Sequence, residues 1–319
     1  MRILFITANR LGDAILSTGL LQELHLRFPK ARFTVACGPA AAGIFAGMPN
    51  LERLIVMEKL PWARHWWELW KKVATRRWRI IIDLRGSGIS QFLLARRRRT
   101  FSGGSPRHHK VIALSQLLKL PRPASPTVWI GEQHRAEAAR LWPDDGRPVL
   151  ALGPTANWGG KVWPGERFAE LARRLTAADG ILPDARIVVF GGPGEELLAK
   201  PALDGLPPER TLNLVGRLDL LTIAAAMQRS SLYIGNDSGL MHLAAASGVP
   251  TLGLFGPSRE QIYGPWGEKT AAVRTDLSYD EIIRQKDYDY RKQDSHMLTL
   301  SVEKAQRAAE HLWRYCRDE

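Results

Sequence analysis

The chain has 319 residues, which is too long for one ordinary domain and suits two domains of about 150 residues each. Its 45% hydrophobic and 24% charged residues exclude disorder, collagen and coiled coil, and no apolar run is long enough to predict a membrane-spanning helix or a signal peptide. The net charge of +13 comes from the first half, since residues 1–150 hold 25 Lys and Arg against 10 Asp and Glu. This half is therefore expected to meet an anionic partner.

The first half alternates apolar strand-like segments with helical ones. Strands are predicted at 3–7, 33–37, 54–57 and 80–84, and helices at 13–28, 39–47, 63–77 and 88–96. Near-continuous apolar strands separated by helices are typical of a parallel sheet covered on both faces. The proline-rich segment 119–127 predicts an extended loop. A second break at 143–148 predicts the boundary between domains covering 1–145 and 146–319.

The alternation restarts after this break. Strands are predicted at 149–153, 187–190, 212–215, 232–235 and 251–255, with helices near 164–177 and after residue 194. Two consecutive units of this kind predict an α/β protein with two doubly wound, Rossmann-like domains. Ligands in such sheets bind beyond the carboxyl ends of the strands. Catalytic and ligand-binding residues are therefore expected directly after each strand.

In the first domain, a carboxylate follows the first strand. Asp13 lies beside a glycine at the start of a predicted helix. An acid at this place is often a cap or first-turn residue that the helix dipole stabilises. The other interpretation is a general base facing the cleft between the domains. The motif by itself leaves both open.

In the second domain, three strand ends carry residues suited to a nucleoside diphosphate. Lys161 can neutralise a phosphate near a helix start, although it can equally be a solvated surface lysine. Glu195 follows a glycine-rich turn and can bind ribose hydroxyls, while the missing GxGxxG disfavours a dinucleotide. The segment 237–239 begins a helix whose N–H groups can hold a pyrophosphate. His242 follows one turn later, where a histidine is more often a buried packing residue.

Four segments of the chain resemble glycosyltransferase family 9, the ADP-heptose:lipopolysaccharide heptosyltransferases. They are RILFITANRLGDAILSTGLL, PTANWGGKVWPGERFAELARRL, VVFGGPGEE and NDSGLMHLAAASGVPTLGLFGPS, and they occur in the family's order between residues 2 and 258. The resemblance implies a GT-B fold, with two Rossmann-like domains facing across a cleft, the acceptor on the first and the sugar nucleotide on the second. It also implies an inverting transfer that needs neither a metal nor a cofactor.

The resemblance also assigns roles to residues. Asp13 matches the proposed catalytic base of the family. The donor-binding positions that it implies are Lys161 for the diphosphate, Glu195 for the ribose, and Asp237, Ser238, Gly239 and His242 for the sugar and diphosphate. Many relatives have two hydroxyl residues before the lysine. Here Thr155 is followed by Ala156, so one phosphate contact of the family is in question.

A metal site is not expected. The DxD triplet 287–289 lies in a charged polar tail, which is typical of solvated surface. The two cysteines, Cys37 and Cys316, are far apart without a CxxC pattern, which disfavours a disulfide and a cysteine zinc site. Lys161 and the helix start at 238–239 are then expected to stabilise the leaving diphosphate.

The basic half contains an aromatic stripe. Trp62, Trp66 and Trp70 are four residues apart and would share a helix face, which is either core or a surface at the headgroup level of an anionic membrane. A run of four arginines is expected at a helix end, with some of them exposed. The residues assigned to an acceptor or membrane surface are Arg10, Trp66, Arg96, Arg97, Arg98 and Arg99.

These observations predict a glycosyltransferase that moves a heptose from ADP-heptose onto a lipopolysaccharide core or related glycan. The expected place is the cytoplasmic face of the inner membrane, with peripheral attachment. Three alternatives stay open: the same fold with another nucleotide-sugar donor, a sugar-nucleotide 2-epimerase, and a non-catalytic protein that binds an anionic surface. Nucleic acid is not expected, because no nucleic-acid-binding motif is present.

Overall fold

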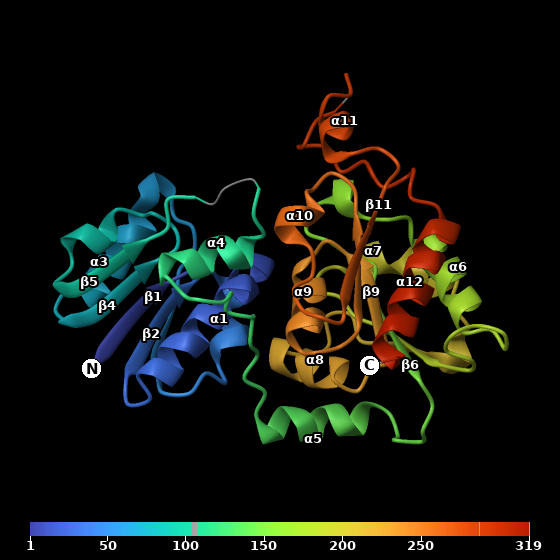
Figure 1. The fold of residues 1–319 in the computed structure, drawn as a ribbon, viewed down its shortest axis with the longest axis horizontal. Helices are drawn as coiled ribbons and strands as arrows, with labels where there is room; N and C mark the ends of the chain where they lie inside the picture. The colour runs from blue at the N-terminus through green and yellow to red at the C-terminus, as the bar shows by residue number, and fades with distance from the viewer. Residues whose placement is uncertain (104–106, 287, 319) are drawn as a thin grey trace. The chain divides into compact units, whose positions relative to one another are not determined.

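The computed structural model describes residues 1–103, 107–286 and 288–318, and it divides the chain into two compact units, 1–131 and 132–319 (Figure 1). This division precedes α5 (Glu132–Leu141), whereas the sequence analysis placed the boundary after it, at 145/146. The reason is that α5 packs on α8 (Leu220–Met227) of the second unit. The Arg229 guanidinium, just after α8, donates hydrogen bonds to the carbonyl oxygens of Ala138 and Trp142.

The first unit is built on a five-stranded parallel sheet with the order β3-β2-β1-β4-β5. Residues 3–6 of the central strand are fully buried, as the apolar strands of parallel sheets generally are. The strands are β1 (Arg2–Ile6), β2 (Arg32–Cys37), β3 (Leu51–Val56), β4 (Trp78–Asp83) and β5 (Ala95–Thr100). The helices are α1 (Leu11–Arg27), α2 (Pro39–Ala42), α3 (Arg64–Val73) and α4 (Lys110–Leu117), with the 3-10 helices η1 (Gly43–Phe45), η2 (Pro61–Ala63) and η3 (Ile89–Phe92).

The helix predicted at 88–96 is wrong, because this segment forms only η3 and then enters the edge strand β5. The four arginines 96–99 therefore lie in a strand and not at a helix end. Their strand pairs in parallel with β4, where Arg97 lies beside Ile80 and Arg99 beside Ile82. Successive side chains of a strand point to opposite faces. The arginines are thus divided between the two faces of the sheet, and their charges also protect this edge from pairing with another strand.

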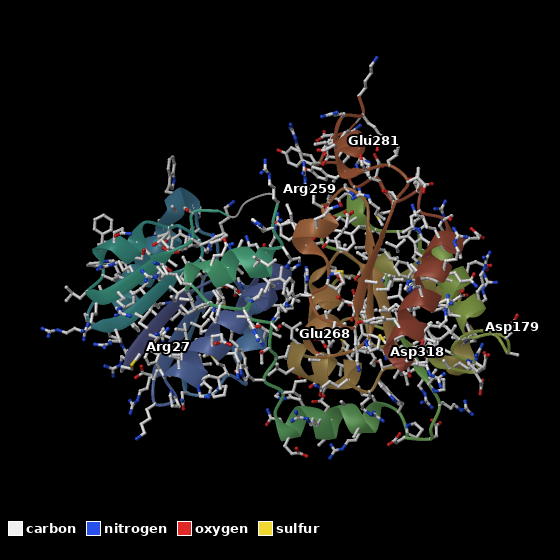
Figure 2. The ribbon with its side chains drawn as sticks, in the orientation of Figure 1. Arg27, Asp179, Arg259, Glu268, Glu281 and Asp318 are labelled. Carbon is white, nitrogen blue, oxygen red and sulfur yellow. The ribbon has the colours of Figure 1, made fainter. Side chains whose placement is uncertain are left out.

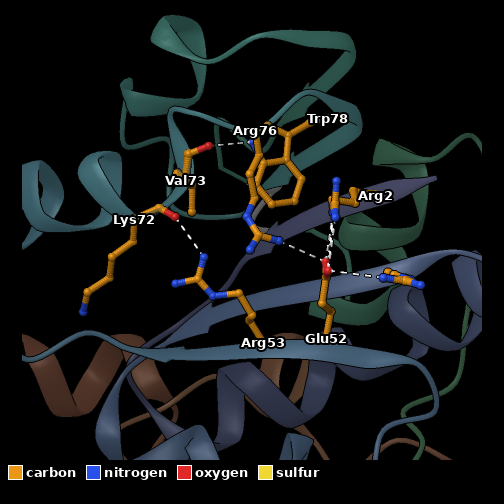
Figure 3. A network of polar contacts seen from close by, with 8 residues as sticks. Arg2, Glu52, Arg53, Lys72, Val73, Arg76 and Trp78 are labelled. Atoms are coloured by element: carbon orange, nitrogen blue, oxygen red, sulfur yellow. Dashed lines mark hydrogen bonds and ion pairs between the residues drawn. The ribbon is translucent and has the colours of Figure 1, made fainter.

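Glu52 at the start of the sheet connects the amino ends of several strands (Figure 3). Its carboxylate accepts a hydrogen bond from Arg2 Nε at 3.1 Å, and Arg76 Nη1 lies 3.2 Å away. Arg32 adds a third cation at 3.7 Å. The hydrogen bond from Arg2, together with these cations, holds the pKa of Glu52 below its ordinary value. The network fixes the end of the sheet opposite to the one where ligands of parallel α/β sheets bind.

The second unit is built on a six-stranded parallel sheet with the order β11-β10-β9-β6-β7-β8. One face packs on three helices through a buried cluster that includes Phe168, Ala199 and Ala305. The strands are β6 (Val149–Gly153), β7 (Arg186–Val189), β8 (Thr211–Asn213), β9 (Leu232–Asn236), β10 (Thr251–Phe255) and β11 (Thr270–Arg274). Besides α5 and α8, the helices are α6 (Gly165–Leu175), α7 (Glu196–Asp204), α9 (Gly239–Ala246), α10 (Glu260–Tyr263), α11 (Tyr279–Ile283) and α12 (Val302–Arg317), with η4 (Gly159–Lys161) and η5 (Pro208–Arg210).

The ends of the helices show local reasons for their positions. The helix α11 begins at a capping box, in which the Ser278 side chain accepts from the Glu281 N–H and the Glu281 carboxylate accepts from the Ser278 N–H. Glu281 is labelled in Figure 2. The helix α8 begins at Asp219, whose carboxylate accepts from the N–H groups of Leu221 and Thr222. Such caps satisfy backbone donors that have no partner within the helix.

Both units are α/β structures with parallel sheets, which confirms the predicted class of two Rossmann-like domains. In the part of the chain that the structure describes, none of the helices has the length and apolarity needed to cross a bilayer. The strands β9, β6 and β7 are neighbours in the second sheet. The loops that follow these three strands therefore meet at one edge, and they carry the residues singled out in the sequence.

Candidate active site

The loop after β6 and the turn after β9 meet through an ion pair. The Lys161 ammonium lies 2.5 Å from Asp237 Oδ2, and the Asp237 side chain is almost completely buried. Lys161 keeps 23% of its side chain exposed. The buried carboxylate thus holds the ammonium at the surface of the site, where an anionic ligand can reach it.

Asn236, which the sequence analysis did not single out, fixes the backbone on both sides of this loop. Its side chain is fully buried, its Nδ2 donates to the Pro154 carbonyl oxygen at 2.8 Å, and its Oδ1 accepts from the Trp163 N–H at 3.1 Å. Because a buried amide with both partners satisfied is rigid, residues 154–163 are held against the end of β9. Asn236 thereby positions Lys161 without contacting it.

A second support for the same loop comes from residues 292–296. Trp158 Nε1 donates to the Lys292 carbonyl oxygen, the Gly159 N–H donates to Gln293 Oε1, and the Ser295 hydroxyl donates to the Val162 carbonyl oxygen, at 2.8, 2.7 and 2.6 Å. A Cβ at Gly159 would lie 2.1 Å from the Gln293 carbonyl oxygen, so the approach requires glycine. Residues 292–296 of the polar tail therefore pack on the Lys161 loop, whereas the interpretation as solvated surface concerned the triplet 287–289 that precedes them. Of the DxD triplet, Asp287 lies outside the described residues.

Glu195 lies in the turn after β7 and is held by two donors. Its Oε2 accepts from the Thr155 hydroxyl at 2.6 Å and from the Gly192 N–H at 2.7 Å. Thr155 is buried, and its hydroxyl is directed at Glu195. The Thr155 side chain therefore orients the Glu195 carboxylate.

A buried tyrosine fills the space beneath these groups. Tyr233 of β9 is fully buried, and its hydroxyl lies so close to Gly153 and Gly235 that a Cβ on either would be 1.9 or 2.4 Å from it. Burial raises the pKa of Tyr233 well above its ordinary value, so the phenol stays protonated. The Ser238 hydroxyl, also buried, is the side-chain hydrogen-bond partner of the Tyr233 hydroxyl. The tyrosine thus connects the middle of β9 with the start of α9.

The start of α9 supplies backbone donors to the same edge. Ser238 occupies the N-cap position but its side chain makes no cap hydrogen bond. Gly239 is the first residue of the helix, so the N–H groups of the first turn and the helix dipole are directed at the site. His242, one turn later, is buried. The structure thus brings together all seven predicted donor-site residues around the ends of β6, β7 and β9.

In the first unit, Asp13 lies in the first turn of α1 and does not cap it. The N-cap is Arg10, which makes no side-chain cap hydrogen bond. The Asp13 carboxylate is 29% exposed, and its Oδ1 lies 4.0 Å from Lys110 Nζ. Lys110, which the sequence analysis missed, also lies over the Phe101 ring at 4.9 Å. The carboxylate is therefore partly open to solvent, as a group that takes a proton from a substrate must be.

The predicted acceptor-surface residues do not form one patch. Arg10 and Arg96 are exposed, whereas Arg98 folds back and donates to the carbonyl oxygens of Ser90 and Leu93. Arg97 and Arg99 line a cavity of about 80 Å³ on the α1 side of the sheet, together with Glu23 and with Arg27, which is labelled in Figure 2.

The aromatic stripe is likewise divided. Trp62 lies in η2 and not in α3, with φ at 54°, so it does not share a helix face with Trp66 and Trp70. Trp66 and Trp70 are half-buried and pack against the core of the first unit. The Arg85 guanidinium lies over the Trp66 ring at 4.8 Å.

The chain is similar to known glycosyltransferases along almost its full length. A family model described as glycosyltransferase family 9 (heptosyltransferase) matches residues 106–292. Lipooligosaccharide heptosyltransferase 2 of Haemophilus ducreyi is 26% identical over 313 residues, which cover 86% of this chain and 88% of that protein.

Two solved structures share the fold. The crystal structure of a glycosyl transferase family 9 protein from Veillonella parvula has a TM-score of 0.82 and 25% identity, covering 98% of this chain and 97% of that one. The structure of the E. coli ADP-heptose lps heptosyltransferase II has a TM-score of 0.75 and 20% identity, covering 99% and 100%. These similarities confirm the predicted GT-B fold.

Proposed function

The chain belongs to glycosyltransferase family 9 and is a glycosyltransferase, and we propose that it transfers a heptose from ADP-heptose onto a lipopolysaccharide core or related glycan. The observation that carries the donor part is the meeting of Lys161, Glu195 and the start of α9 at one edge of the second sheet. A cation and helix N–H groups suit a diphosphate, and an oriented carboxylate suits ribose hydroxyls. ADP-heptose and lipopolysaccharide are proposed because the E. coli relative is an ADP-heptose lps heptosyltransferase.

In the proposed reaction the acceptor hydroxyl oxygen attacks the anomeric carbon of the donor sugar while its proton passes to the Asp13 carboxylate. The bond from the anomeric carbon to the diphosphate oxygen breaks, and its electron pair leaves with ADP. Attack from the face opposite to the leaving group inverts the anomeric centre. Asp13 suits this role because its carboxylate is partly exposed and lies in the first turn of α1, just after the end of β1.

The negative charge that develops on ADP is met by residues of the second unit in the proposed mechanism. Lys161 and the N–H groups at the start of α9 lie in place before the reaction, and such preorganised charges contribute most where water is displaced. We propose that they replace the divalent cation that many nucleotide-sugar enzymes use. In the described segments, no three His, Cys, Asp or Glu side chains come together as metal ligands would.

The acceptor side of the proposal rests on charge. The first unit has 22 Lys and Arg against 6 Asp and Glu in residues 1–131, which favours a phosphorylated, lipid-linked acceptor over a neutral one. We propose that the enzyme works at the cytoplasmic face of the inner membrane as a peripheral protein.

The direct test is turnover with purified ADP-heptose and a heptose-deficient lipopolysaccharide acceptor, followed by mass spectrometry of the lipid and by ADP release. The proposal expects both products in equal amounts, and ADP release only when acceptor is present. Transfer of another sugar in a panel of nucleotide sugars would keep the enzyme class and change the donor. Conversion of the donor without any acceptor would instead indicate an epimerase or hydrolase.

A further inference from the structure

Four large apolar side chains of the first unit are exposed around α3 and η3. Trp62, Phe92, Leu94 and Trp67 have 95%, 78%, 65% and 56% of their surface exposed. We call these four residues the exposed apolar patch. Exposing an indole or phenyl group to water has a free-energy cost that grows with the apolar area exposed. Clusters of this kind on a folded protein mark a surface that meets another apolar phase.

Contacts between α3 and η3 hold two members of the patch, Trp67 and Phe92, in place. The Trp67 ring stacks on the Trp70 ring, with centroids 4.9 Å apart and planes 6° apart. Trp70 Nε1 in turn donates to the carbonyl oxygen of Phe92 at 3.3 Å. The inner side chains Leu69 of α3 and Ile89 of η3 are buried in the core of the unit. Trp67 and Phe92 therefore lie on a fixed part of the fold.

The backbone beside Trp62 is held in an unfavourable conformation. Trp62 and Ala63 have φ angles of 54° and 56°, in the left-handed region that residues other than glycine seldom adopt. The Trp62 indole is 95% exposed, so packing of this side chain within the protein does not compensate for the backbone strain. Strain of this kind persists at sites where a side chain is presented to a ligand or a surface.

The charges around the patch are almost all positive. Residues 59–99 hold 12 Lys and Arg against 2 Asp and Glu, and one of these two acids, Asp83, is buried and accepts hydrogen bonds from Ser87. Arg64 and Lys71 of α3 are exposed, and the Lys71 ammonium lies 5.5 Å from the Trp67 ring. Exposed tryptophan beside lysine and arginine is the combination that suits the headgroup region of an anionic bilayer, where the ring enters the interface and the cation meets phosphate.

We propose that the exposed apolar patch inserts into the interface of an anionic phospholipid bilayer, with Arg64 and Lys71 in contact with headgroup phosphates. The insertion falls to Trp62 and Trp67 because Trp66 and Trp70 are half-buried and pack against the core. This inference deepens the proposed function, since a lipid-linked acceptor is met at such a surface. Vesicle binding itself does not require turnover, so the two can fail separately.

The test is flotation of the intact protein with vesicles of phosphatidylcholine alone or mixed in equal parts with phosphatidylglycerol. Wild-type protein should float with the mixed vesicles, and its tryptophan emission should shift to the blue. The double variant Trp62→Ser/Phe92→Ser should bind the mixed vesicles at least about tenfold more weakly, from the apolar area withdrawn from the interface. The matched control is Leu197→Ser in the second unit, where 84% of the side chain is exposed, and it should bind as wild type.

Charge reversal at Lys71, Lys71→Glu, should weaken binding to the mixed vesicles by at least about fivefold and make it less dependent on salt, because each cation near the surface contributes about that factor. The control Lys269→Glu, an exposed lysine of the second unit, should have no such effect.

Turnover with a detergent-dispersed acceptor should be unchanged in the Trp62→Ser/Phe92→Ser variant. Equal vesicle binding by that variant and Leu197→Ser would overturn the proposal. So would a concentration-dependent dimer, seen by sedimentation, that the double variant abolishes.

Discussion

Replacing Asn236 by alanine tests whether the hydrogen bonds of this side chain fix the loop that carries Lys161. The substitution leaves the Pro154 carbonyl oxygen and the Trp163 N–H without their side-chain partner in a fully buried place. Each buried group left unsatisfied costs about 1–3 kcal/mol, so the free energy of unfolding should fall by at least about 2 kcal/mol. The loop would also have to be ordered when a ligand binds, and we expect the Kd for ADP to rise by about tenfold.

Urea unfolding and calorimetry with ADP measure the two effects of Asn236→Ala separately. The matched control is Asn213→Ala at the end of the edge strand β8, where one hydrogen bond, from the Val215 N–H to Asn213 Oδ1, is lost. The control should destabilise the protein by about 1 kcal/mol and leave ADP binding unchanged. If Asn236→Ala unfolds like Asn213→Ala, or if its ADP affinity equals that of wild type, the loop is held by other contacts and our reasoning fails.

Four further outcomes are expected. Asp13→Asn should lower the rate of transfer by roughly 10²–10⁴-fold with ADP binding intact, as loss of a general base does. Stopped-flow ADP release measures the rate, and calorimetry measures ADP binding. Near wild-type turnover would show that Asp13 is not the general base. Lys161→Ala should weaken ADP binding far more than adenosine binding, whereas Glu195→Ala should weaken both, and equal losses in the Lys161 variant would refute its contact with the diphosphate. Transfer should survive excess EDTA, and a loss that Mg²⁺ restores would refute the metal-free mechanism. Glu52→Gln should remove part of the acid dependence of stability. Because the pKa of Glu52 is lowered in the folded state, its contribution to the free energy of unfolding is present above the pKa of the unfolded state and is lost as the pH falls through the pKa of the folded state. Urea unfolding of the variant and of wild type at a series of acidic pH values measures the difference.

The sequence predicted the strands whose side chains are buried on both faces, because such strands appear as continuous apolar runs. The segments 149–153 and 232–235 are examples, and the structure has β6 and β9 there. The edge strands β5 and β11 were missed for the opposite reason. The segment ARRRRT is held as a strand by hydrogen bonds to β4, and nothing in its own composition favours that structure.

The candidate site was predicted as separate residues and not as pairs. Motif similarity selected Lys161 and Asp237, but their ion pair joins positions far apart in the chain and depends on the neighbouring ends of β6 and β9. Asn236 stands next to a selected residue, and a polar side chain closing a buried apolar strand was the available signal. The support from residues 292–296 had none, because each of their hydrogen bonds to the Lys161 loop joins positions more than 130 residues apart and involves a backbone group, which has no sequence pattern.

The pairing of the donor-site charges has a consequence for how binding energy is used. Lys161 is paired with Asp237, and Glu195 is oriented by Thr155, so the site has no unpaired cation among these residues before a ligand arrives. A diphosphate must share Lys161 with Asp237, which limits how strongly the ground state of the donor is bound. As the bond to the anomeric carbon breaks, the negative charge on the departing diphosphate increases and its attraction to the ammonium and to the start of α9 rises with it. An interaction that strengthens toward the transition state accelerates the reaction, whereas equal binding of both states does not.

Asp237→Asn should therefore tighten ADP binding by freeing Lys161 while lowering the rate of transfer, because the ammonium is then less firmly placed. Calorimetry with single-turnover kinetics measures both, and weaker ADP binding in this variant would show that Asp237 itself contacts the donor.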